Sequence, residues 1–581
     1  MTVSFLPEQA NDGAEALRLD FLVVGAGPAG ASLACFLGKY GFHGLIISSA
    51  PSSANTPRAH INNQATMECI RDLDPEMEKE WRKLGYEGEE MSHTRWCETM
   101  TGREYGRVNS WGFGPKRSGE YQLRSPCSHL ELNQTWTEPI LLRYATQHGF
   151  PCRFRTQFLS FDDSARDFIA VTVRDMIFNT TFTIKAKYLF GADGARSQIV
   201  QQLQLPLIVK PSGGTALNVL VRADLTELMK SRKGNLHYLV RPGMDDPDFA
   251  WWTVFRMFTP SFEQVQKQVY SALGDNSIPV EIQRIDKWVI NDIVAEKYSK
   301  GNIFCLGDAV HRHPPMNGLG SNTCIQDAAN LAWKINLVER GLAGSALLDT
   351  YTVERQPVGA GVVARANQSI RDQIPVFEAL GFLKSSFEER KQELAVLDEK
   401  SERGSKKRRD LNKAIEHMSH EFLTLGAESN QLYRSTAVCL DRVGDEPALP
   451  SDADLYYEPH TYPGHRLPHA WLNTAIPGEK ISTIDLAGKG RFSLFIGYGG
   501  EAWKQAAKLI QQSLNIEVAV FEVGYGLEYE AVYGDWDRLR EVEEDGCVLV
   551  RPDNFVAWRS NSMVLDANAI LEKVFRSILS V

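Results

Sequence analysis

The stretch Cys305-Leu-Gly-Asp-Ala-Val-His-Arg-His-Pro-Pro-Met-Asn-Gly-Leu-Gly-Ser-Asn322 decides the fold when it is read together with a second stretch near the N-terminus. There, the apolar run Phe21-Leu-Val-Val24 precedes Gly25-Ala-Gly-Pro-Ala-Gly30, a helical pattern follows to Tyr40, and Leu45-Ile-Ile47 has strand character again. Such glycines let backbone amides approach a pyrophosphate at a helix N-terminus, although a tight structural turn is the alternative. Two nucleotide-type motifs so far apart predict one long dinucleotide cofactor.

Composition indicates a multidomain globular protein that acts on small molecules. The 581 residues are too many for one compact core, and 63 basic against 73 acidic residues give 63 − 73 = −10, which argues against nucleic acid or a membrane surface as a partner. No apolar run approaches the roughly 20 residues that span a bilayer, and no secretory signal is visible. Nine cysteines without a CxxC pair favour reduced thiols and a cytoplasmic location.

Polar residues at strand ends suggest where the cofactor is held. The acidic residue expected about 20 positions after the glycine turn to bind a ribose is absent, and Ser48 and Ser49 stand there instead. Two later strands end in Asp193-Gly194 and Gly307-Asp308, and each delivers a carboxylate to the same kind of crevice. A plain β-turn is the alternative for Asp193.

The remaining segments predict three further regions. Residues 216–224, 236–240 and 249–258 look like strands of an inserted antiparallel sheet, and residues 376–433 have a helical pattern. The basic cluster Lys406-Lys-Arg-Arg409 lies among acidic residues, so a solvated helix face is favoured over nucleic-acid binding. After Asp452, strand-helix-strand patterns with no CxxC form a module that cannot perform dithiol chemistry.

Several motifs together give the chain a family resemblance. It resembles the group A FAD-dependent aromatic hydroxylases, in the phenol hydroxylase and 2,4-dichlorophenol 6-monooxygenase branch, over about residues 20–581. The motifs are the glycine turn, Pro57-Arg-Ala-His-Ile-Asn-Asn-Gln64, Asp193-Gly-Ala-Arg-Ser197, Gly307-Asp-Ala-Val-His-Arg-His-Pro-Pro315, Tyr456-Tyr-Glu-Pro-His-Thr-Tyr-Pro-Gly464 and Val548-Leu-Val-Arg-Pro-Asp-Asn-Phe-Val-Ala-Trp-Arg559.

The resemblance implies a fold of the α/β (α+β) class. A three-layer, Rossmann-like FAD-binding domain of the p-hydroxybenzoate hydroxylase type would be formed by residues 20–200 and 301–375, after an N-terminal extension at 1–19. Residues 201–300 would be mainly the inserted antiparallel sheet that binds substrate. A helical connection at 376–450 would lead to a thioredoxin-like domain without redox cysteines at 451–581.

The resemblance also implies which residues hold FAD. Asp308 would accept a hydrogen bond from a ribityl hydroxyl, and the amides that open the helix after residue 319 would face the flavin pyrimidine edge, where they stabilise negative charge. Asn317 stands where many relatives have glycine, which leaves the local backbone geometry open. The expected cofactor residues are Gly25, Gly27, Pro28, Ala29, Gly30, Ser48, Ser49, Arg58, Gln134, Asp193, Gly194, Gly307, Asp308, Pro315, Gly320, Ser321 and Asn322.

His60 is the candidate catalytic residue. It follows Arg58-Ala59 at the position where a related phenol hydroxylase has an aspartate near the substrate hydroxyl, and an imidazole can accept a phenolic proton at neutral pH. A structural role for His60 is the alternative. Tyr238, Trp252 and Arg256 could line an aromatic substrate pocket, with core packing as the alternative for the tryptophan. His311 and His313 lack further ligands at metal-binding spacing, so no metal site is expected.

The expected function is therefore an FAD-dependent monooxygenase. The resemblance implies that NADPH or NADH and O2 are co-substrates, that a C4a-hydroperoxyflavin hydroxylates a phenolic ring, in the ortho position, and that the protein is a homodimer. A larger polyketide or anthraquinone-type phenol is the alternative substrate. A non-catalytic flavin-binding interaction protein is a further alternative, which an intact Asp308 to Asn322 segment disfavours.

Overall fold

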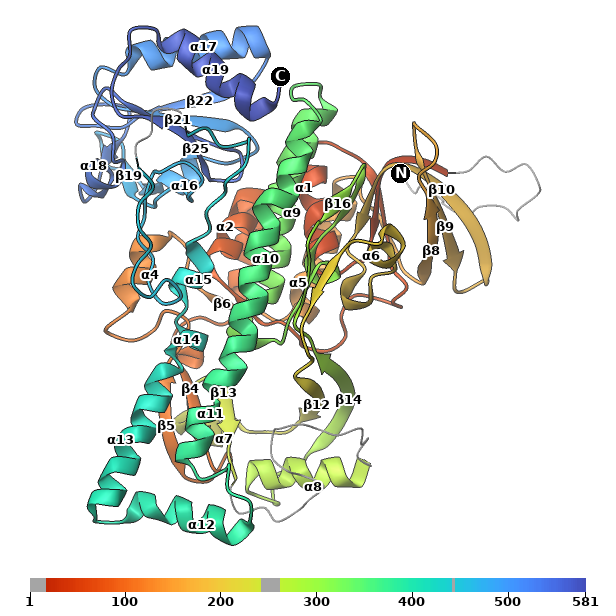
Figure 1. Ribbon diagram of the computed structural model, residues 1–581, viewed down its shortest axis with the longest axis vertical. Coiled ribbons are helices and arrows are strands. Elements are labelled where there is room, and N and C mark those ends of the chain that lie inside the picture. Colours follow the sequence, from red (N-terminus) through yellow and green to blue (C-terminus); the bar gives the residue numbers. More distant parts are fainter. Residues whose placement is uncertain (1–16, 242–261, 441–444) are drawn as a thin grey trace.

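The computed structural model describes residues 17–241, 262–440 and 445–581, and its eight-stranded mixed sheet around β1 lies on the right in Figure 1. The parallel strands run in the order β17, β10, β1, β2, β7, so the sheet is doubly wound about β1. The strands are β1 (Leu17–Val24), β2 (Gly44–Ile47), β7 (Cys152–Arg153), β8 (Thr156–Asp162), β9 (Ile169–Asp175), β10 (Thr180–Gly191), β16 (Ser299–Lys300) and β17 (Ile303–Cys305). Strands β8 and β9 continue antiparallel from β10, as β16 does from β17.

Helices with buried faces pack against this sheet. The predicted helix after the glycine turn is confirmed as α1, and its residues 29 to 38 are all buried because alanine and glycine permit close approach. Helix α9 follows the Gly-Asp motif, packs on α1 and is covered by the long α10. The helices are α1 (Pro28–Lys39), α2 (Gln64–Leu73), α3 (Pro75–Leu84), α4 (Ser118–Arg124), α5 (Gln134–Gln147), α6 (Gln198–Leu203), α9 (Gly320–Glu339) and α10 (Ala346–Asp372).

Short strand pairs connect the sheet to the region below it in Figure 1. One pair joins β3 (Ile61–Asn62) to β6 (Leu130–Glu131), which brings the segment after β2 against the start of α5. A second set joins β11 (Leu207–Val209), β15 (Ile293–Ala295) and β18 (His311–Arg312). These pairings gather residues from three distant parts of the chain around the start of α9.

Strands of the inserted region form two small sheets. Strand β12 (Gly214–Arg222) pairs antiparallel with β14 (Glu281–Ile290), while β13 (Leu236–Leu239) pairs parallel with β4 (His93–Cys97), which continues antiparallel to β5 (Glu104–Asn109). The predicted strands at 216–224 and 236–240 are confirmed as β12 and β13, and the one at 249–258 lies outside the described residues. Helices α7 (Thr226–Ser231) and α8 (Phe262–Leu273) complete the region.

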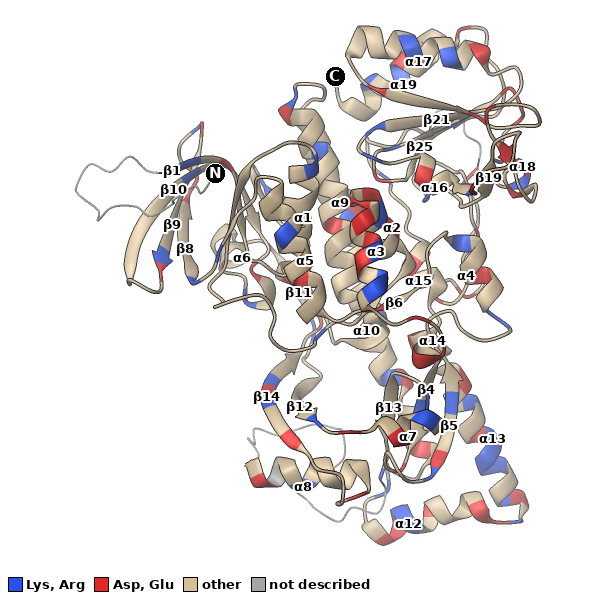
Figure 2. Cartoon of the chain, turned by 180° about the vertical axis from the view of Figure 1, so that it is seen from behind, with Lys and Arg blue, Asp and Glu red and all other residues tan. Residues whose placement is uncertain are grey.

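The connecting segment after α10 is helical, as the sequence predicts. It contains α11 (Ile374–Ala379), α12 (Phe387–Ala395), α13 (Glu402–His417), α14 (Ser419–Phe422) and α15 (Leu425–Ser429). Figure 2 shows residues of both charge signs along α12 and α13. Lys406 pairs with Asp410 at 2.9 Å and Lys407 pairs with Glu393, so acidic partners balance the basic cluster.

The C-terminal module lies at the opposite end of the molecule from α12 and α13 (Figure 1). Its four-stranded sheet has the order β22 (Val518–Glu522), β21 (Phe492–Ile496), β24 (Cys547–Val550), β25 (Val556–Ser560), with α17 (Glu501–Leu514) packed on α19 (Ala567–Leu579). The smaller elements are β19 (Trp471–Asn473), β20 (Ile481–Ser482), β23 (Glu530–Ala531), α16 (Thr483–Leu486) and α18 (Asp535–Leu539). Trp333 and Leu337 of α9 belong to its core, so the two modules share buried apolar surface.

No helix within the described ranges is both long enough and apolar enough to cross a membrane.

Candidate functional site

The glycine turn between β1 and α1 has the geometry of a pyrophosphate cradle. Gly25 has a φ of +116°, and a Cβ there would lie 2.0 Å from the carbonyl oxygen of Ala192, so only glycine fits. Gly30 is equally constrained, since its Cβ would lie 2.0 Å from the carbonyl oxygen of Gly25. Helix α1 begins at Pro28 with no side chain capping its first turn, and the nearest atom to a Cβ on Gly27 would be 3.9 Å away. The turn therefore offers free backbone amides to an anionic group and leaves room for that group to bind.

The ribose side of this turn contains a buried carboxylate that sequence reasoning missed. Ser49 is exposed after β2, and the hydroxyl of Ser48 accepts from the amide of Ala50 at 3.3 Å. The side chain of Gln134 donates to Glu138, whose second oxygen accepts from the amide of Ala54, and Glu138 is only 4% exposed. Burial raises the pKa of Glu138, while bonds from Gln134 and Ala54 and the charge of Arg58 oppose the rise.

Arg58 and Gln134 therefore converge on Glu138 beside the glycine turn. Arg58 itself is exposed, and Gln134 begins α5. A signal for Glu138 was present in the sequence, because it is an acidic residue on the apolar face of a helix, four residues after a candidate cofactor residue.

The Gly307-Asp308 turn is held in place by an ion cluster in the core. The amide of Gly307 donates to Asp327 at 3.2 Å, and the same carboxylate binds His311 at 2.8 Å and Arg355 at 2.7 Å. Burial would raise the pKa of Asp327, but Arg355 and His311 outweigh it and lower that pKa. Asp308 is exposed, so its carboxylate is available to a hydroxyl of the cofactor. His311 is thus buried in the core, where it pairs with Asp327.

The Gly-Asp turn, the glycine turn and α9 adjoin one another. A Cβ on Gly307 would lie 2.8 Å from Sγ of Cys324 in α9 and 2.9 Å from Cβ of Ala29 in α1. These three features are therefore brought to one edge of the sheet, where one extended cofactor can reach them all.

Asp193 lies beside the glycine turn but also has a structural task. Its carboxylate accepts from the amide of Gln198 at 2.8 Å, which anchors the start of α6, while one of its oxygens is buried with no hydrogen-bond partner among the described residues. Burial raises the pKa of Asp193 in spite of bonds to Ser197 and the α6 amides. Gly194 follows it in a turn with a φ of +76°.

The start of α9 offers backbone amides to a ligand. Its first residues, Gly320 and Ser321, are capped by no side chain, and Pro315 just before them is exposed. Asn322 is 1% exposed, and its side chain accepts from the amide of Asn63 at 2.9 Å and donates to the carbonyl of Ile61 at 2.9 Å. The side chain of Asn322 therefore fastens β3 to α9. Its backbone N–H remains as the group that can face a flavin.

His60 lies next to this junction and has an acidic partner. Its Nδ1 is 3.4 Å from Oε1 of Glu131 on β6, and both side chains are half-buried. Oε2 of Glu131 accepts from the side-chain Nδ2 of Asn235 at 2.8 Å, and Oδ1 of Asn235 accepts from the indole N–H of Trp111 at 3.2 Å. A carboxylate that is itself held in place can orient an imidazole and stabilise its protonated form. Glu131 lies three residues before Gln134 in the sequence, but only the pairing of β3 with β6 brings it to His60.

Aromatic side chains gather in the apolar cluster that contains Ile61, the residue after His60. Tyr238 stacks on Trp96 with ring centroids 5.3 Å apart, and the ring of Phe422 meets those of Trp96, Trp111 and Tyr238 edge-on. The neighbour of His60, Ile61, belongs to the same apolar cluster. Tyr238 thus packs against this apolar cluster, while Trp252 and Arg256 lie outside the described residues.

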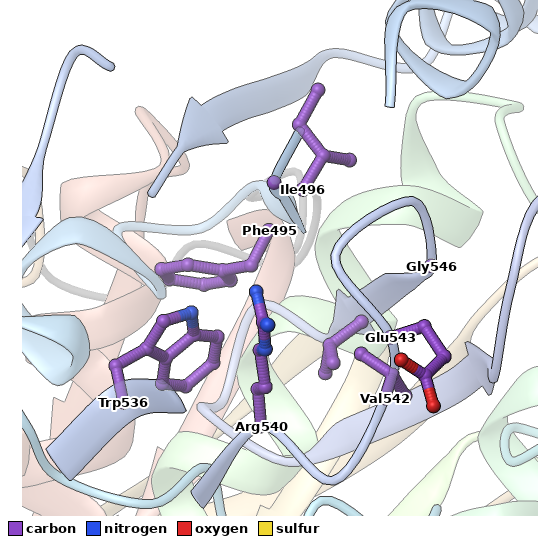
Figure 3. Close-up of a pocket in the computed structure, with 9 residues that line it drawn as sticks. Phe495, Ile496, Trp536, Arg540, Val542, Glu543 and Gly546 are labelled. Carbon is purple, nitrogen blue, oxygen red and sulfur yellow. The ribbon is translucent and has the colours of Figure 1, made fainter. Parts of the chain in front are cut away.

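A separate pocket lies in the C-terminal module. Figure 3 shows Arg540 beside the rings of Phe495 and Trp536, and the residues that line it all fall between 495 and 548. It includes none of the cofactor or substrate candidates, so the chemistry does not belong there.

Comparisons with known proteins agree with this geometry. A family model described as an FAD binding domain matches residues 18–366, and one described as the C-terminal part of aromatic-ring hydroxylases matches residues 460–580. The chain is 40% identical to 2,4-dichlorophenol 6-monooxygenase of Delftia acidovorans, over 98% of this chain and 100% of that protein. It is 38% identical to phenol 2-monooxygenase of a Pseudomonas species, over 96% and 92%. A putative polyketide hydroxylase of Streptomyces halstedii is more distant, at 28% identity.

Solved structures give the same result. The flavin-dependent monooxygenase PieE, in complex with FAD and substrate, superimposes with a TM-score of 0.91 at 36% identity, covering 98% of this chain and 100% of that one. The glycine turn, the exposed Asp308 and the uncapped start of α9 fit a bound FAD. The chain thus belongs to the FAD-dependent aromatic-ring hydroxylases and is an FAD-dependent aromatic monooxygenase.

Proposed function

We propose that the protein hydroxylates a phenolic ring, ortho to the hydroxyl group, with NAD(P)H and O2 as co-substrates. The observation that carries this proposal is the position of His60: its Nδ1 lies 3.4 Å from Oε1 of Glu131, and the next residue, Ile61, bonds to Asn322 of α9 and belongs to the aromatic cluster. Relatives named for dichlorophenol and phenol support the same substrate class.

Residues of the chain have distinct roles in the proposed hydroxylation. Bound FAD supplies the chemistry that activates O2. His60 accepts the phenolic proton, because a phenolate places more electron density on the ortho carbon than a phenol does. Glu131 stabilises the imidazolium that results, and Trp96, Tyr238 and Phe422 exclude water from the ring.

The expected cofactor residues, from the glycine turn to Asn322, are proposed as FAD ligands. Asp308 would bind the ribityl chain, and the amides of residues 320–322 would bind the flavin. We also propose the domain division given by the sequence, with β4 and β5 added to the substrate region because β4 pairs with β13.

Three finer properties complete the proposal: a homodimer, a thioredoxin-like C-terminal domain and a cytoplasmic location. The strand order β22-β21-β24-β25, with two helices packed together, supports the thioredoxin-like fold of the C-terminal domain. All nine cysteines are free, which supports the cytoplasmic location.

The test measures oxidation of NADPH and of NADH in air with a panel of phenols, followed by the mass of the product. The expected result is phenol-stimulated oxidation and a product heavier by one oxygen atom, with little peroxide. Oxidation that phenols do not stimulate would contradict the proposal and favour a flavin-binding interaction protein. Turnover of an anthraquinone-type phenol without turnover of monocyclic phenols would instead favour the larger substrate class.

A further inference from the structure

The segment from Pro315 to Gly320, which leads into the flavin-binding end of α9, turns at an unusual residue. Asn317 has a φ of +62° and is only 3% exposed. Few residues other than glycine adopt this left-handed conformation, although asparagine does so more readily than most. A glycine would adopt this conformation at no steric cost. The contribution of Asn317 is therefore to be sought in the contacts of its side chain.

Every polar atom of the Asn317 side chain is bonded to a neighbouring helix. Its Nδ2 donates to the carbonyl oxygens of His420 at 2.8 Å and Glu421 at 3.2 Å, both in α14. Its Oδ1 accepts from the hydroxyl of Ser369 in α10 at 2.8 Å. The side chain of Asn317 therefore fastens the turn to α10 and to α14.

Helix α14 is in turn fastened to the substrate side. It has four residues, too few to be stable alone, so contacts with its neighbours hold it in position. The hydroxyl of Tyr238 donates to Oε1 of Glu421 at 2.9 Å, and Gln373 donates to Oε2 at 3.1 Å. Gln373 also accepts from the indole N–H of Trp96 at 3.2 Å, and Trp96 stacks on Tyr238.

The Glu421 carboxyl is completely buried in this arrangement. Burial raises its pKa to about 8, although Tyr238, Gln373 and Arg365 oppose the rise and Asp372 adds to it. Its two oxygens accept from Tyr238 and Gln373, so the carboxyl joins Tyr238 to α14. Neither Asn317 nor Glu421 is assigned a part in the hydroxylation described above.

We propose that Asn317 is a positioning residue for the flavin, and that it ties the flavin-facing segment, through α14 and Glu421, to Tyr238 in the aromatic cluster. A phenol that packs against the partly exposed Tyr238 then alters the support of the segment that faces the flavin. The first part rests on FAD binding alone, and the link to Tyr238 rests on the proposed phenolic substrate.

The first experiment tests the positioning role with Asn317→Gly. This variant keeps the backbone conformation and removes only the three bonds. The matched control is Asn515→Gly, since Asn515 is also left-handed, with a φ of +55°, but is exposed at the end of α17. We expect Asn317→Gly to raise the dissociation constant of FAD about tenfold, the equivalent of one or two neutral hydrogen bonds, and to shift the flavin absorbance spectrum. Asn515→Gly should match the wild type.

Equal FAD affinity and equal flavin spectra in Asn317→Gly and Asn515→Gly would overturn the proposal. If Asn317→Gly does not fold, Asn317→Asp replaces it, because the aspartate tolerates the same backbone and keeps the acceptor for Ser369 but loses the donor to α14. The same two readouts decide the result.

The second experiment tests the link to the substrate side with Tyr238→Phe, which removes only the hydroxyl that binds Glu421. Its matched control is Tyr105→Phe, since Tyr105 packs against the same cluster and its buried hydroxyl has no hydrogen-bond partner among the described residues. The readout is the change in flavin absorbance at saturating phenol. We expect Tyr238→Phe to lose most of that change and Tyr105→Phe to retain it.

An undiminished change in Tyr238→Phe would overturn the link. The two failures are distinguishable: a wild-type protein that binds FAD but shows no response to any phenol contradicts the proposed substrate and the link together, while the FAD affinity of Asn317→Gly still decides the positioning role.

Discussion

At the scale of single residues, the chemistry depends on a pair that comes from two strands. His60 precedes β3 and Glu131 ends β6, and the antiparallel pairing of these strands sets the distance of 3.4 Å between the side chains. Neither residue is distinctive by itself. Because the two side chains lie close together, His60 is a candidate base whose imidazole Glu131 can orient.

Replacing His60 by glutamine gives a prediction that separates proton transfer from packing. For unsubstituted phenol, kcat/KM should fall by about 100-fold or more, the usual loss for a missing general base. For phenols whose substituents make them already ionised at the assay pH, the loss should be much smaller, because no proton has to be removed. Steady-state kinetics across such a series measures the trend, with His43→Gln, at an exposed histidine, as the control. The same loss for every phenol would show that His60 acts through packing.

At the scale of elements, the strand-turn-helix units could be predicted and the links between them could not. The glycine turn with its flanking strands and helix, and the strand before Gly307, are consecutive in sequence, so local patterns reveal them. Glu421 and its partner Tyr238 are 183 residues apart, and Asn317 is 104 residues from Glu421. Pairings of that range depend on tertiary packing, which one sequence does not display.

The glycine turn also gives a prediction about the whole β1–α1 unit. Gly25→Ala should abolish FAD binding and lower thermal stability, because its Cβ would lie 2.0 Å from the carbonyl oxygen of Ala192 at a φ of +116°. Gly41→Ala is the matched control just after α1, where φ is +83° but no atom lies within 4 Å, so only the backbone cost of about 1–2 kcal/mol applies. The flavin absorbance of the purified proteins and their melting temperatures report both effects. Full FAD occupancy in Gly25→Ala would contradict this account of the turn.

At the scale of the whole molecule, buried charges join the FAD-binding and C-terminal modules. Glu354 of α10 binds Arg551 through both oxygens, at 2.6 and 2.8 Å, and Lys334 of α9 at 2.7 Å. All three side chains are inaccessible to solvent. Burial would raise the pKa of Glu354, but Arg551 and Lys334 outweigh it and hold that pKa far below its usual range. Glu354 therefore pairs with one cation from each module, and Asp553 is a second carboxylate beside Arg551.

Removing this charge should weaken the junction as a whole. Glu354→Gln leaves Lys334 and Arg551 buried with only Asp553 as an anionic partner, so the free energy of unfolding at pH 7 should fall by about 3–5 kcal/mol. Because the pKa of Glu354 is lower in the folded than in the unfolded protein, its contribution is complete above the unfolded value and is lost as the pH falls below it. The difference between wild type and variant should therefore shrink on acidification below about pH 4.3. Denaturant unfolding at several pH values measures it, and Asp410→Asn, which breaks an exposed pair with Lys406, should produce no measurable change. A Glu354→Gln protein as stable as Asp410→Asn would show that the two modules are held together by their shared apolar core around Trp333 alone.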